Sequence, residues 1–123
     1  MQNAYEDRLN AGTYQDDVQC QIRLQPDPRD EVREPMVGWI SERLLARLRH
    51  LGLAYDLPLL ARLPGDGSIS YPEIQLVSVE EELAFLFDVV SDHVLLEAIE
   101  PMREMIRRAM RDPRGWSLVA ETP

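Results

Sequence analysis

Nine carboxylates lie between Pro64 and Glu100, and this stretch contains no arginine or lysine. The other residues of the chain are electrically balanced, so about a third of the sequence holds the whole net charge of −9. Carboxylates at this density can form an acid–base pair, hold a hard cation, or present an acidic surface to a basic partner. They can also act only as solvated charges that keep the protein in solution.

The residues required by the commonest catalytic and metal sites are missing from the sequence. Cys20 is the only cysteine, which excludes CxxC metal and redox sites. His50 and His93 are far apart in sequence, and neither belongs to an H-E-x-x-H motif. There is also no glycine-rich phosphate loop and no EF-hand loop. We therefore expect no catalytic residues, no metal site and no cofactor. The alternative is a pair of carboxylates that acts in catalysis or holds a hard cation.

The amino-acid composition limits the classes of binding partner and the cellular compartments that we expect for this chain. The chain has 22 acidic and 13 basic residues, which argues against binding to nucleic acid or to an anionic membrane surface. No apolar run approaches the length of a bilayer span, and the N-terminus lacks the pattern of a signal peptide. A single cysteine fits a reducing compartment. These features predict a cytoplasmic protein.

Two consecutive helices, predicted over 79–90 and 92–111, carry much of the acidic stretch. In the second helix apolar residues recur at steps of three and four, which places them on one face. A face of this width must be buried, and we expect it to pack against the other apolar stripes. The predicted core contacts join Leu95, Ile99, Met102 and Ile106 to Ile22, Leu44 and Leu48.

Local signals mark the ends of these two helices. Ser78 and Glu81 fit a capping box for the first helix, and Asp92 or Ser91 can cap the second. Pro101 lies inside the second helix and predicts a kink or a break there.

The other elements follow from alternation and from helix-end signals. Alternation over 18–24 predicts a half-buried strand with Cys20 on its apolar side. A helix is predicted over 35–51, with Pro35 in its first turn and Gly52 just after its end. Further strands are predicted over 53–63, 69–77 (with a bulge or kink at Pro72–Glu73) and 116–120.

This order, β-α-β-β-α-α-β, indicates the α+β class: a small, mostly antiparallel four-stranded sheet with helices on one face. It corresponds to a variant of the ferredoxin-like order in which the second helix is doubled. Residues 1–123 are expected to form a single domain, with 1–16 as a weakly structured N-terminal segment.

Two functions compete. The first is a small acidic protein-binding module, such as a bacterial immunity protein that inhibits a basic toxin or nuclease. The second is a structural or chaperone component of a larger phage or secretion assembly, which would form homo-oligomers. Under the first hypothesis Glu80 and Glu82 point outward from the first of the paired helices. The residues predicted to contact the basic partner are Glu73, Glu80, Glu82, Asp88, Asp92 and Glu97.

Overall fold

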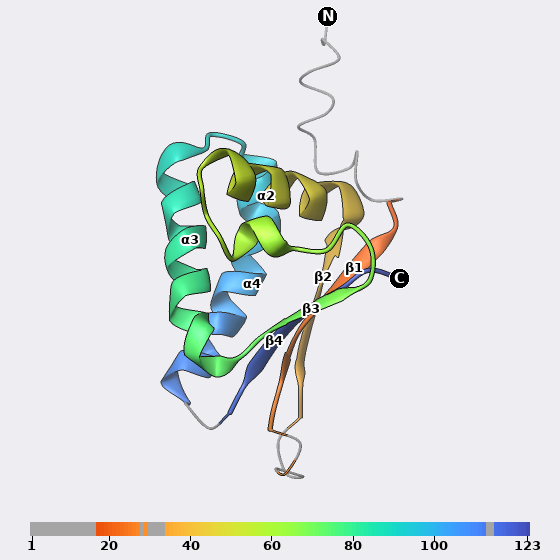
Figure 1. The fold of residues 1–123 in the computed structure, drawn as a ribbon, viewed down its shortest axis with the longest axis vertical. Helices are drawn as coiled ribbons and strands as arrows, with labels where there is room; N and C mark the ends of the chain where they lie inside the picture. The colour runs from red at the N-terminus through yellow and green to blue at the C-terminus, as the bar shows by residue number, and fades with distance from the viewer. Residues whose placement is uncertain (1–16, 28, 30–33, 113–114) are drawn as a thin grey trace, which may run out of the picture.

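A computed structural model describes residues 17–27, 29, 34–112 and 115–123. Within these residues the chain forms one four-stranded antiparallel sheet and three α-helices (Figure 1). This arrangement confirms the expected α+β class. The segment 1–16, expected to be weakly structured, lies outside the described residues.

The sheet has the strand order β2-β1-β4-β3, and all neighbouring strands are antiparallel. Strand β1 (Gln19–Gln25) lies between β2 (Met36–Ser41) and β4 (Ser117–Glu121). Strand β3 (Ser68–Tyr71) pairs with the other side of β4. The two edge strands are therefore β2 and β3, and the centre of the sheet joins segments from both ends of the described chain.

Three helices cover one face of this sheet (Figure 1). They are α2 (Glu42–Ala54), α3 (Leu76–Val89) and α4 (His93–Arg111), and two short 3-10 helices, η2 (Leu60–Arg62) and η3 (Glu73–Gln75), precede α3. Helix α4 packs against β1, β2 and α2, and α3 packs against α4. In Figure 1, α4 accordingly lies between α3 and the strands.

Helix α4 matches its prediction closely. The Asp92 carboxylate accepts a hydrogen bond of 3.3 Å from the Leu95 N–H, which confirms Asp92 as the N-cap. The helix continues through Pro101, so the break that was one of the two outcomes predicted there does not occur.

The predicted core is also confirmed. One cluster of buried residues contains both sets of apolar side chains that were expected to meet, and Ile99 in that cluster is completely buried. The cluster draws on β1, β2, α2, η2, α3, α4 and β4, so these elements share one hydrophobic core.

The helix predicted from residue 35 is wrong over its first turns, because residues 36–41 form strand β2 and α2 begins at Glu42. The side chains of Met36 and Ile40 lie on the helix-covered face, whereas those of Val37 and Trp39 are exposed. A short apolar segment of this kind satisfies both the helical and the strand period, so tertiary pairing with β1 decides its structure.

The strand predicted over 53–63 is also wrong. Helix α2 continues to Ala54, a turn follows, and residues 60–62 form η2. Gly52 is not the residue after the helix but lies within α2, buried where α2 and η2 approach each other. A Cβ atom at Gly52 would lie only 2.5 Å from the Ala61 nitrogen. The observed element order is therefore β-β-α-β-α-α-β.

The predicted strand over 69–77 is too long. Strand β3 ends at Tyr71, directly before Pro72, which cannot donate a ladder hydrogen bond. Helix α3 then begins at Leu76, with Gln75 as an N-cap that makes no side-chain bond. The capping box at Ser78 and the bulge at Pro72–Glu73 are consequently wrong.

Candidate functional site

A short segment directly after α2 lies between two pockets on the surface of the described residues. We call Leu57 and Pro58 the 57–58 ridge. The chain turns at Asp56, whose φ of 56° is left-handed, and the Leu57 N–H donates to the Gly52 carbonyl over 2.7 Å. The Asp56 N–H also donates to the Leu53 carbonyl, over 3.5 Å. This is a Schellman-type helix end with an aspartate in the position that glycine usually occupies.

Two buried side chains from other elements fix the end of the ridge. The Glu82 carboxylate of α3 accepts from the Leu59 N–H at 3.1 Å and from the Leu60 N–H at 2.9 Å. The Tyr71 hydroxyl of β3 donates to the Leu59 carbonyl at 2.6 Å, and burial raises the pKa of Tyr71. Both backbone polar groups of Leu59 are therefore satisfied by side chains, and the ridge is tied to α3 and to the sheet.

The ridge separates two pockets, both of which include Leu57 and Pro58 in their lining. The first lies between the ridge and α3 and has a volume of about 520 Å³; its other lining residues are Leu59, Gln75, Ser78, Glu81, Glu82 and Phe85. The second lies on the α2 side and has a volume of about 290 Å³; its other lining residues are Gly52, Leu53, Asp56 and Ala61.

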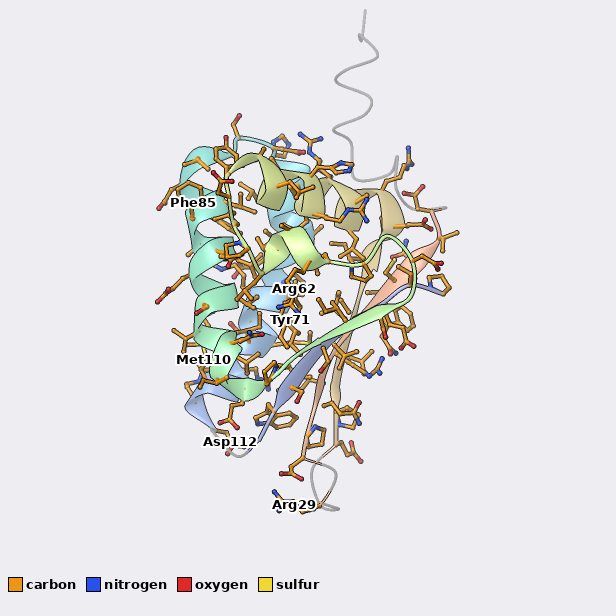
Figure 2. The ribbon with its side chains drawn as sticks, in the orientation of Figure 1. Arg29, Arg62, Tyr71, Phe85, Met110 and Asp112 are labelled. Carbon is orange, nitrogen blue, oxygen red and sulfur yellow. The ribbon has the colours of Figure 1, made fainter. Side chains whose placement is uncertain are left out.

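Exposed apolar side chains surround these pockets. The rings of Tyr55 and Phe85 meet edge to face, with centroids 5.6 Å apart, and both rings remain partly exposed. Leu53 is 59% exposed. Figure 2 shows Phe85 on the outer side of α3, away from the sheet. Large apolar residues gathered around a concave surface are typical of a protein-binding site.

Among the residues that the structure describes, carboxylates are the only charged groups that line the two pockets. Glu81 and Asp56 are exposed at the surface, and Glu82 lies deeper, where its oxygens accept the ridge amides. A long basic side chain has a matching form, because its methylene stem is apolar and its head is cationic. The surface can therefore accept arginine or lysine side chains that enter the pockets beside the ridge.

The structure gives Glu80 an internal partner. Its carboxylate binds the Arg103 guanidinium of α4 at 2.6 Å, and both side chains are mostly buried. The hydrogen bonds to Glu80 raise the pKa of Arg103, whose guanidinium also lies 4.4 Å from the centre of the Phe87 ring. Because Glu80 joins α3 to α4 and Glu82 holds the ridge, the expectation that both point outward is wrong.

Asp92 is also engaged within the fold. Besides capping α4, its carboxylate binds the Arg47 guanidinium of α2 at 2.8 Å, and Asp92 is buried. Asp88 and Glu97 are exposed as predicted, and Glu73 in η3 is partly buried. Of the six predicted contact residues, the pockets include only Glu82 in their lining.

The sequence did not indicate that Asp56 and Glu81 line pockets. Asp56 was placed inside a predicted strand, and Glu81 was assigned to a capping box that does not form. Pro58 carried the missing signal, because it lies three residues after the C-cap Tyr55, and proline is common one to three residues beyond a helix end.

Other kinds of site have little support in the described part of the chain. It contains no group of three histidine, cysteine, aspartate or glutamate side chains that could hold a metal ion. None of its helices is long and apolar enough to cross a membrane. Cys20 is buried, and burial together with the charge of Glu42 raises the pKa of its thiol. A raised pKa makes this thiol a poor nucleophile at neutral pH.

Comparison with known proteins identifies no relative: no family model, curated protein or solved structure matches the chain.

Proposed function

We propose that this chain is a small acidic protein-binding module, and that the 57–58 ridge and its two pockets bind a basic segment of a protein partner. The observation that carries the proposal is the lining of the pockets, in which the described residues combine apolar side chains with three carboxylates and include no cation. An uncharged apolar ligand would leave these carboxylates without a counter-charge, whereas a basic side chain would supply it.

The acidic side chains are expected to contribute differently to binding, because they differ in their exposure to solvent. Glu81 and Asp56 are accessible, so they would make charge-assisted hydrogen bonds to the incoming guanidinium or ammonium groups. Glu82 would contribute mainly its charge, because its oxygens already accept the ridge amides. The exposed acids Asp88 and Glu97 would act at longer range, steering a basic partner toward the surface.

The more specific form of this proposal is an inhibitor of the immunity type, made by a bacterium and acting in its cytoplasm on a basic toxin or nuclease. The concentration of negative charge on one third of the chain supports it, because such inhibitors gain association rate from opposite charge. A component of a larger assembly is the alternative, and such a chain would form homo-oligomers without binding a basic segment at the ridge.

A hexa-arginine peptide is a suitable probe, with the uncharged hexa-citrulline peptide as its control. Titration followed by amide NMR should shift the resonances of Leu57, Leu59 and Glu81 with the arginine peptide only. The variant Asp56→Asn/Glu81→Gln should weaken binding. The charge-matched control Glu34→Gln/Asp66→Asn alters two exposed acids outside the pockets and should weaken it much less.

Equal weakening by the two double variants would show that only the net charge matters and would reject the ridge as the site. A natural partner, once purified, should follow the same order of affinities. Its binding should also weaken as salt is added, because screening reduces attraction between opposite charges.

A further inference from the structure

Strand β2 is an edge strand, and its register with β1 shows which of its backbone N–H and C=O groups point away from the sheet. The Glu42 N–H donates to the Val18 carbonyl at 2.9 Å, in continuation of the β1–β2 register that pairs Gln19 with Ser41. Because hydrogen-bonded residues alternate along an antiparallel ladder, Gly38 and Ile40 face β1. The N–H and C=O groups of the residues between them, Val37 and Trp39, therefore point away from the sheet.

The two edges of this sheet differ. Strand β3 has only four residues and is followed directly by Pro72, and both features discourage further pairing. Strand β2 has six residues, none of them charged and none proline. The side chains of Val37 and Trp39, on the face without helices, are 47% and 62% exposed. Folded proteins usually protect an edge of this kind with charge, proline or another strand.

We propose that β2 pairs with β2 of a second copy of the chain, antiparallel about a two-fold axis through Gly38. In this register Val37 lies opposite Trp39 of the second copy, and their outward N–H and C=O groups bond each other. Met36 lies opposite Ile40 of the second copy on the helix-covered face. Each pair joins residues of the same face, as an antiparallel register requires, and a tryptophan opposite a β-branched residue is a favourable cross-strand pair.

The distribution of charge on the chain favours a second copy as the binding partner and the outer edge of β2 as the place where it binds. Two chains of net charge −9 repel each other over most orientations. Strand β2 carries no charge, and on the adjoining open face Arg23 is neutralised by Glu121 at 2.6 Å. A basic protein segment would find no carboxylate on β2, whereas another uncharged β2 strand fits without a buried charge. The inference does not depend on the 57–58 ridge.

The salt dependence of this dimer has a definite sign. The remaining long-range interaction between the copies is repulsive, so added salt should strengthen dimerisation. Binding of a basic peptide at the ridge should respond in the opposite direction. One salt series therefore separates the two proposals, and either one can fail alone.

Sedimentation equilibrium over a concentration series tests the dimer directly. The mass should rise from 14.2 kDa toward twice that value, and the rise should occur at lower concentration in high salt. Trp39→Lys places a charge on the exposed edge, and Val37→Pro removes one outward N–H without removing a bond to β1. Both variants should remain at 14.2 kDa over the same range. The control Ser70→Lys alters the other edge strand, on the same open face, and should dimerise like the wild type.

A wild-type chain that stays monomeric at millimolar concentration in high salt overturns the inference. So does a dimer that survives Trp39→Lys, an exposed substitution that does not depend on how well the proline variant folds. If a different protein adds a strand to β2 while the chain alone remains monomeric, the edge is a binding site but the inferred occupant is wrong.

Discussion

Removal of the Glu82 carboxylate gives the sharpest test of how the ridge is held. In Glu82→Ala, the N–H groups of Leu59 and Leu60 lose the acceptor that they have at 2.9–3.2 Å. A buried donor left without a partner costs about 1–3 kcal/mol, and there are two. We expect a loss of about 2–4 kcal/mol in the free energy of unfolding, because water entering the adjoining pocket can satisfy part of this demand.

Glu82→Gln separates the hydrogen bonds from the charge. Oε1 of Glu82 accepts from both amides, so a single amide oxygen can replace it. What is lost is the extra strength of bonds to a charged acceptor, and we expect a cost of about 1–2 kcal/mol. The adjacent exposed residue supplies the control: Glu81→Ala should change stability by less than about 0.5 kcal/mol.

Urea unfolding followed by circular dichroism measures all three variants at a protein concentration too low for association. The slopes should agree, so that differences in midpoint report differences in stability. If Glu82→Ala loses less than about 1 kcal/mol, these bonds are replaced by water at little cost and Glu82 does not hold the ridge. If Glu82→Gln is as damaging as Glu82→Ala, the charge and not the pair of acceptor contacts is responsible.

Three further predictions concern the core and two titrating groups. Ile99→Ala should lower the free energy of unfolding by about 2–5 kcal/mol because Ile99 is fully buried, whereas the exposed control Leu53→Ala should cost far less; a loss below about 0.5 kcal/mol at Ile99 would contradict the core assignment. Hydrogen bonds from Arg43 and Ser41 hold the pKa of Asp17 below its ordinary value. Its stabilising contribution should thus be complete above the unfolded pKa of about 4 and disappear as the pH falls through the lower folded value, and Asp17→Asn should reduce the acid-side slope of stability. The raised pKa of Tyr71 acts on the alkaline side, because above about pH 10 the unfolded state loses the phenol proton first and stability falls. Tyr71→Phe should reduce that alkaline slope while costing about 0.5–1.5 kcal/mol at neutral pH through loss of its hydrogen bond to the Leu59 carbonyl, which still accepts from the Arg62 N–H, and an unchanged slope would show that Tyr71 is not the titrating group.

The elements that could be predicted from sequence are those whose pattern fits only one period. The apolar positions of α4 repeat over five turns, β1 alternates over seven residues, and Asp92 stands at a helix start. Residues 36–41 fit both periods. The leucines of 53–63 alternate in the sequence by coincidence, because this segment consists of a helix end, a turn and η2. In such segments contacts with distant elements decide the structure, and a single sequence does not contain them.

The candidate site was harder to predict because side-chain roles depend on those same distant contacts. Glu80 and Glu82 belong to one acidic triplet in the sequence, yet each binds a group more than twenty positions away. No local pattern distinguishes these two from Glu81, which is exposed. The excess of acid could be recognised from composition, whereas the acids that remain available to a partner could be identified only from the fold.

The position of α4 between α3 and the strands has a consequence for valency. It keeps the 57–58 ridge, which is attached to α3, away from the outer edge of β2. A dimer joined through β2 would leave both ridges uncovered, and the assembly would be bivalent. A partner that is itself dimeric, or that carries two basic segments, would then gain avidity of about 10²–10⁴-fold if its two segments can span the distance between the ridges.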